Sequence, residues 1–226
     1  MTVELVSLIP ELRQRLETVA QPDKAPQMKA YMKDCSEFLG VPTPERRTAS
    51  KSFIAAGRDA TAGHLMDAAD VCWEQPEREF QYVATDLLSR WKAQLNSGSL
   101  SGVERLVRTK SWWDTVDALA GQVVGSLVAN NPDLTATMDA WIDDPDCWIA
   151  RTAILHQLGY GAGTDAERLF DYVDRRAADT EFFIRKACGW ALRQYARHDP
   201  EAVRRYVLDR GELLSGLTRR EALKHL

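Results

Sequence analysis

Two adjacent tryptophans and two carboxylates lie within nine residues of the chain, in the segment TKSWWDTVD over Thr109–Asp117. Residues four apart share one side of a helix, so the ring of Trp113 and the carboxylate of Asp117 should point the same way. A flat aromatic surface beside a fixed negative charge suits a cationic, planar ligand. This segment is therefore the first candidate for a functional site.

Helices must position these side chains, because the chain shows helical periodicity and no strand-like alternation. The first predicted helix carries apolar residues from Val3 to Val19, and the last is capped by Thr218. Thr43 caps the third, with Pro44 at its first position. The other predicted helices cover roughly residues 25–38, 62–73, 76–95, 100–108, 112–129, 133–142, 147–158, 165–178, 181–197 and 200–209.

The predicted helices also resemble one another at a fixed period. Phe80, Trp113, Trp148 and Phe183 each come near the start of a helix, 33, 35 and 35 residues apart. Such a period is typical of stacked helix pairs, each of which buries its apolar face against its neighbours. We therefore expect a single α-helical repeat domain over residues 1–226, a solenoid of about six repeats with one concave face.

Composition narrows the function classes. Hydrophobic residues make up 45% of the 226, no apolar run is long enough to span a bilayer, and no apolar leader follows Met1. These features predict a cytoplasmic protein. The four cysteines and four histidines are dispersed singly, which predicts free buried thiols, no metal site and no nucleophilic arrangement. Lys110 has no sequence neighbour that would lower its pKa, which argues against Schiff-base chemistry.

The net charge of −4 is unevenly distributed. Residues 181–226 hold ten Lys/Arg and six Asp/Glu, a surplus of +4, which leaves −8 for the rest of the chain. One explanation of this surplus is a positively charged surface that binds a polyanion. Solvated charged helix faces without a binding role explain the same surplus equally well.

Polar and aromatic residues that interrupt the apolar pattern of successive inner helices are the candidates for the site. They are Tyr31, Trp113, Asp117, Arg151, Trp190 and Arg193. Trp190 and Arg193 lie three apart and so share one side of their helix.

Most of these candidates also have a purely structural explanation. Trp113 aligns in the repeat with the core anchors Trp148 and Phe183, and Trp190 aligns with Leu155. Tyr31 also fits the core side of an amphipathic helix, and the two arginines can be solvated or paired. Asp117 differs, because Thr152 and Ala187 hold its equivalent positions and a buried carboxylate needs a partner or a cleft.

Several segments together resemble the AlkD-like alkylpurine DNA glycosylases of the HEAT-like-repeat DNA alkylation repair family. The likeness runs from about Gln21 to the last residue. Its segments are TKSWWDTVD, MKAYMK, FLGVPTPERR, WIARTAILHQL, EFFIRKACGWALRQYA and REALKHL.

The resemblance implies an all-α, HEAT-like solenoid that holds duplex DNA in its concave face and excises N3- and N7-alkylated purines without flipping the base into a pocket. It assigns Asp117, Trp113 and Trp190 to the catalytic cleft. It assigns Tyr31, Arg151 and Arg193 to the cleft lining or to the DNA backbone. It implies a monomer that acts on the nucleoid and needs no cofactor.

The chemistry of the residues agrees with that implication. A purine alkylated at N3 or N7 is already cationic, so its glycosidic bond breaks without a general acid and leaves an oxocarbenium-like sugar. A fixed carboxylate such as Asp117 stabilises that charge and orients water. Indole faces attract cations by roughly 0.5–2 kcal/mol, which suits Trp113 and Trp190. The alternative hypothesis is a non-catalytic helical-repeat scaffold that binds DNA structure or a protein partner.

Overall fold

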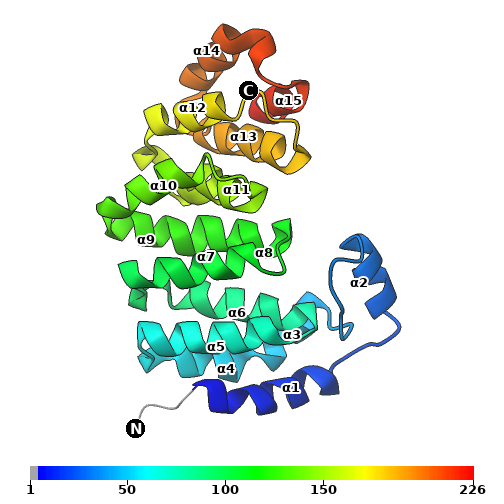
Figure 1. Ribbon diagram of the computed structural model, residues 1–226. Helices are drawn as coiled ribbons and strands as arrows, with labels where there is room; N and C mark the ends of the chain where they lie inside the picture. Colours follow the sequence, from blue (N-terminus) through cyan, green and yellow to red (C-terminus); the bar gives the residue numbers. More distant parts are fainter. Residues whose placement is uncertain (1–4) are drawn as a thin grey trace. The chain divides into compact units, whose positions relative to one another are not determined.

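The computed structural model describes residues 5–226, and within that range every regular element is a helix (Figure 1). One isolated bridge between Glu37 and Glu77 is the exception. The predicted all-α helical-repeat fold is therefore confirmed. The position of Val3 lies outside the described residues. None of the described helices has the length and apolar character needed to cross a membrane.

The chain divides into two compact units, one ending at Ala118 and the other covering Leu119–Leu226. The single domain over residues 1–226 and its concave face stay predictions. The first unit contains α1 (Ile9–Thr18), α2 (Ala25–Tyr31), α3 (Thr43–Ala49), α4 (Lys51–Ala56), α5 (Ala62–Glu74), α6 (Arg78–Arg90), α7 (Leu100–Arg108) and α8 (Trp113–Ala118), with short 3₁₀ helices at Leu5–Leu8, Gly57–Asp59, Lys92–Gln94 and Ser97–Ser99.

The second unit begins with a π-helical segment, Leu119–Val124, that continues directly from α8. Its other helices are α9 (Gly125–Asn130), α10 (Thr135–Trp141), α11 (Cys147–Leu155), α12 (Ala166–Arg175), α13 (Phe182–Tyr195), α14 (Pro200–Arg210) and α15 (Gly216–Ala222), with 3₁₀ helices at Pro132–Leu134, His156–Gly159, Gly161–Gly163 and Gly211–Leu213.

Helix α7 shows why apolar periodicity predicts a helix. In α7, Leu100, Val103, Leu106 and Val107 are buried on one side, while Arg108 on the other side is exposed. Full burial of one such side chain stabilises the fold by roughly 1.5–3 kcal/mol. The helix therefore begins and ends where the sequence predicts.

The four aromatic anchors of the repeat lie in the first turns of α6, α8, α11 and α13, as the spacing predicts. Phe80 is fully buried. Within the second unit, the rings of Trp148 and Phe183 lie 4.8 Å apart at a tilt of 41°. The repeats that contain α11 and α13 thus contact each other through these rings.

Charged pairs about one repeat apart join neighbouring helices. In the first unit they are Asp70–Arg105 and Arg78–Asp114, both at 2.5 Å. In the second unit, Asp174 pairs with Arg210 at 2.7 Å. A single repeat can therefore satisfy its charges only when its neighbour is in place.

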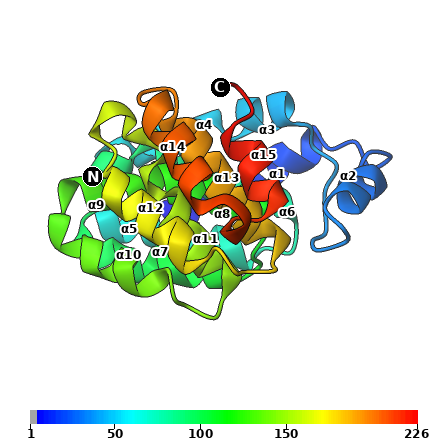
Figure 2. The same cartoon turned by 90° about the horizontal axis from the view of Figure 1, so that it is seen from above.

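Helix α2 is shorter than predicted and ends at Tyr31 instead of continuing to residue 38. Lys33 and Asp34 have φ of 56° and 59°, which reverses the chain. Asp tolerates this left-handed conformation better than most residues. Figures 1 and 2 both show α2 lying to one side of the other helices of its unit.

Three other helix boundaries differ from prediction. The predicted helix 112–129 is interrupted by the π-helical segment, which widens the turns after Ala118. Ser215, not Thr218, caps α15, because the Ser215 hydroxyl accepts a hydrogen bond from the Thr218 backbone at 3.0 Å. Thr43 does not cap the third helix either, because Thr43 is the first residue of α3 and Pro42 occupies the cap position.

The cysteines are free, as predicted. Cys72 and Cys188 are buried, and burial raises the pKa of each thiol to about 12. Cys35 is exposed, so the prediction that all four are buried is wrong.

Candidate functional site

Helix α8 places Trp113 and Asp117 one turn apart on the same side, as predicted from their spacing. Both residues are half-buried. A turn at Lys110, with φ of 50°, precedes the helix, and the Ser111 hydroxyl donates to the Val107 carbonyl at 2.6 Å. The end of α7 is thus joined to the start of α8 by a fixed geometry.

The second carboxylate of the segment, Asp114, is part of a buried ion pair. Its oxygens accept from Nε and Nη2 of Arg78 at 3.0 and 2.5 Å. Arg78 is fully buried, and it also donates to the Thr115 hydroxyl at 2.9 Å. The sequence analysis did not assign this role to Asp114. The separation of 36 residues, close to one repeat, is the signal that could have found it.

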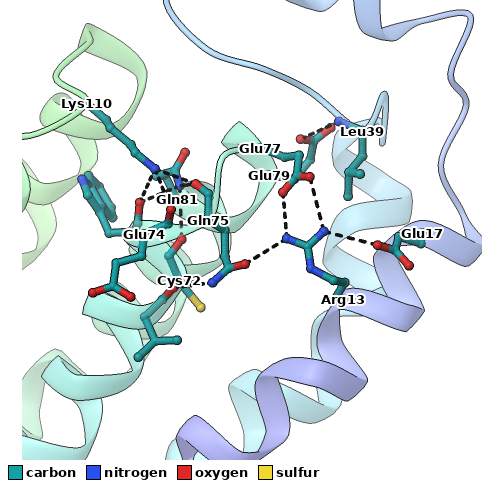
Figure 3. Close-up of polar contacts among 12 residues, drawn as sticks. Arg13, Glu17, Leu39, Cys72, Glu74, Gln75, Glu77, Glu79, Gln81 and Lys110 are labelled. Carbon is teal, nitrogen blue, oxygen red and sulfur yellow. Dashed lines mark hydrogen bonds and ion pairs between the residues drawn. The ribbon is translucent and has the colours of Figure 1, made fainter.

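Lys110, just before α8, binds the C-terminal end of α5 (Figure 3). Its ammonium donates to the carbonyls of Trp73, Glu74 and Gln75 at the end of α5, at 2.6, 3.2 and 2.6 Å. A cation is favourable there, since the last carbonyls of a helix are partly negative. Burial and the nearby Arg78 lower the pKa of Lys110, so the expectation that nothing lowers it is wrong.

Tyr31 from α2 lies against Trp113, with ring centroids 6.3 Å apart and the rings nearly perpendicular at 77°. Tyr31 is 71% exposed, so its interpretation as a core residue is wrong. The two rings open onto a hollow of about 290 Å³. Its other lining residues are Gln27, Met28, Met32, Phe38, Tyr82 and Asp114.

A buried carboxylate, that of Glu79, holds the backbone of the loop that follows α2. Glu79 accepts hydrogen bonds from the backbone of Leu39, Gly40 and Val41 at 3.1, 2.9 and 3.0 Å. Gly40 has φ of 85°, and a Cβ there would lie 2.2 Å from the Gln21 carbonyl oxygen. Glycine is therefore required at this close approach.

Arg13 of α1 forms a further tie to the same region (Figure 3). Its guanidinium donates to Glu77 at 2.9 Å and to the Gln75 side chain at 2.9 Å. The loop before α6 is therefore held from two sides, by α1 and by Lys110.

In the second unit, α13 carries both Trp190 and Arg193. Trp190 is half-buried, although Leu155 at the equivalent repeat position is fully buried. The Arg193 guanidinium is paired with the Glu221 carboxylate of α15, and its Nη1 donates to the Glu221 carbonyl at 3.1 Å. The interpretation of Arg193 as a paired arginine is therefore confirmed.

Glu221 is a residue that the sequence analysis missed. Besides Arg193, it accepts from Lys186 at 2.5 Å, and Lys186 and then Arg193 hold the pKa of the Glu221 carboxyl at about 2. Gly189 allows α15 to approach, because a Cβ there would lie 2.4 Å from the Glu221 Cβ. The separation of 35 residues between Lys186 and Glu221 is again close to one repeat.

Arg151 on α11 is buried, with 3% of its surface exposed, so of the two alternatives, a solvated or a paired arginine, the structure excludes the solvated one. It donates to the Phe183 carbonyl, and its guanidinium lies 5.9 Å from the centre of the Phe183 ring. Arg151 thereby links α11 to α13.

The structure thus brings Tyr31 to Trp113 in the first unit and places Trp190 beside Arg193 on α13 in the second. A joint site of all six predicted residues stays a prediction.

Repeating helix pairs with aromatic anchors and charged pairs at the repeat spacing define an all-α helical-repeat protein. A sequence model of the DNA alkylation repair enzyme family matches residues 12–226, so the chain belongs to the DNA alkylation repair enzyme family.

A solved structure, a predicted DNA alkylation repair enzyme from Enterococcus faecalis, is similar to the chain. The two are 32% identical with a TM-score of 0.85, over 92% of this chain and 96% of that chain. No curated protein sequence matches the chain. Family membership confirms a role in DNA alkylation repair, with DNA as the substrate.

Proposed function

We propose that the protein is a monofunctional DNA glycosylase for positively charged N3- and N7-alkylated purines in duplex DNA. It hydrolyses the N-glycosidic bond without flipping the base into a pocket. The observation that carries this proposal is α8, which holds the Asp117 carboxylate one turn from the Trp113 indole, with the exposed Tyr31 ring against that indole.

The main contribution of the protein to the reaction is a fixed negative charge beside the sugar. The bond between C1′ and the purine nitrogen breaks, and its electron pair neutralises the cationic base. Asp117 stabilises the positive sugar and orients the water that adds to C1′ and loses a proton. Trp113 and Trp190 present indole faces to the cationic nucleotide.

Tyr31 and Arg193 complete the site in this proposal by lining it and holding the DNA backbone. Arg151, predicted for the same role, is buried and supports the start of α13 through the Phe183 carbonyl instead. The hydrogen bonds of Arg193 all come from Nη1, so among the described residues its Nε and Nη2 keep their hydrogens for a phosphate. Glu221 holds the guanidinium in place for that contact. Contacts of this kind position the duplex without reading its sequence.

The test is release of 7-methylguanine or 3-methyladenine from methylated duplex DNA. We expect free base and an intact strand with an abasic site, and no measurable release of a neutral base such as hypoxanthine from a matched duplex. Binding of the methylated duplex without base release would favour the non-catalytic scaffold. Weak salt dependence of that binding would point to a protein partner.

A further inference from the structure

A groove of about 390 Å³ lies between α3 and α4 on one side and the C-terminal end of α6 on the other. We call it the basic groove, because four exposed cationic side chains line it. They are Arg47, Lys51, Arg58 and Arg90. None of them lines the hollow beside Trp113.

The described part of the chain does not neutralise these four cations. Among residues 5–226, no carboxylate forms a salt bridge with any of them. The acidic residue that lines the groove, Asp86, is paired with the buried Arg46 at 3.2 Å. The basic groove therefore concentrates positive charge in a chain whose net charge is −4.

The groove has a rigid floor. The Trp91 indole donates to the Ile54 carbonyl at 2.6 Å, and the Gln94 amide donates to the Arg58 carbonyl. Gly57 lets the indole approach, since a Cβ there would lie 2.6 Å from Trp91 Cδ1. The two sides are thus fixed relative to each other before any ligand binds, which lowers the entropic cost of binding.

We propose that the basic groove binds the phosphodiester backbone of duplex DNA, outside the candidate active site. This inference rests on the proposed function for its choice of polyanion. Three of the four cations are arginines, whose planar forks match phosphate oxygens.

The Trp91 indole, which lines the groove, favours contact with the DNA backbone over contact with DNA bases. The Arg90 guanidinium lies 4.7 Å from the centre of the Trp91 ring and covers it. A guanidinium therefore already covers one face of the indole, and that face is not open for an unpaired base to stack on. Affinity gained in this way is independent of sequence and sensitive to salt.

The experiment uses the full chain with Lys51→Gln and Arg90→Gln combined, one change on each side of the groove. Fluorescence anisotropy gives the affinity for an undamaged labelled duplex across a salt series. Loss of two phosphate contacts should make the slope of log affinity against log salt shallower by about 1.8. Between about 50 and 200 mM salt, the variant should therefore lose roughly tenfold less affinity than wild type.

Arg204→Gln with Arg205→Gln is the matched control. These arginines are exposed on α14, outside the groove, and the control removes the same total charge. We expect it to keep the wild-type slope, whereas equal slopes for the groove variant and wild type would overturn the proposal.

Single-turnover base release separates this proposal from the proposed function. At saturating enzyme, the groove variant should keep the wild-type rate on methylated duplex within about twofold, because the groove supplies affinity only. A large loss at saturation would overturn a purely binding role. If wild type releases no base while the groove variant still has a shallower slope, the groove stands and the glycosylase assignment fails.

Discussion

Individual residues of the candidate site are held by partners that lie in the next repeat. Spacing alone places Trp190 and Arg193 on one side of a helix, and α13 confirms it. The partner of Arg193, Glu221, lies 28 residues further on and on another helix. Local periodicity carries no information about such a pair, and the repeat length does not suggest it either, because 28 residues is shorter than the period of 33 to 35.

Replacing Glu221 by Gln tests the strength of this pairing. Its pKa is about 2, below the ordinary 4.5, so the stabilisation is present above pH 4.5 and is lost as the pH falls from 4.5 towards 2. Allowing for solvent screening at Lys186, we expect the variant to lose about 2 kcal/mol of unfolding free energy at pH 7. Urea unfolding at pH 7 and pH 3 measures the loss, which should shrink at pH 3.

Glu212→Gln is the control for that experiment. Glu212 pairs with Arg219 but its side chain is 91% exposed, so solvent screens the pair and the variant should unfold like wild type at both pH values. A Glu221→Gln variant that loses equal stability at both pH values would contradict the assigned ion pairs.

At the scale of elements, the position of α8 depends on the pair between Arg78 of α6 and Asp114. Removing one partner of a buried pair leaves an uncompensated charge, which costs about 3–5 kcal/mol. We therefore expect Asp114→Asn to lower the unfolding free energy by about 3 kcal/mol in urea denaturation at pH 7.

A surface pair at the same repeat spacing is the comparison. Asp70 and Arg105 lie at 2.5 Å with side chains 30% and 56% exposed, so Asp70→Asn should cost less than about 1 kcal/mol. Similar losses for the Asp70 and Asp114 variants would show that burial of the Arg78 pair does not fix α8.

The elements also show which parts of the fold the sequence can predict. Helix α7 follows from its apolar spacing, since its side chains face a core formed by neighbouring repeats. The course of the chain after α2 does not follow, because Glu79, about 40 residues away, holds the backbone of Leu39, Gly40 and Val41. Polar contacts of this range have no periodic trace in the sequence.

At the scale of the whole molecule, family membership and charge distribution point to DNA. The chain matches the DNA alkylation repair enzyme family over residues 12–226, yet its net charge is −4. The basic surplus along the sequence lies in residues 181–226, where the structure pairs Lys186 and Arg193 with Glu221. The unpaired cations of the basic groove come from residues 47–90, which form no charge run, so the sequence could not predict them.

The central claim is that the Asp117 carboxylate stabilises the sugar from which a cationic base departs. Single-turnover release of 7-methylguanine from duplex DNA, measured with Asp117→Asn beside wild type, tests it most directly. The variant should be about 10²–10³-fold slower, whereas Asp133→Asn, at an exposed position on Pro132–Leu134, should match wild type. Equal rates for Asp117→Asn and wild type would contradict the account.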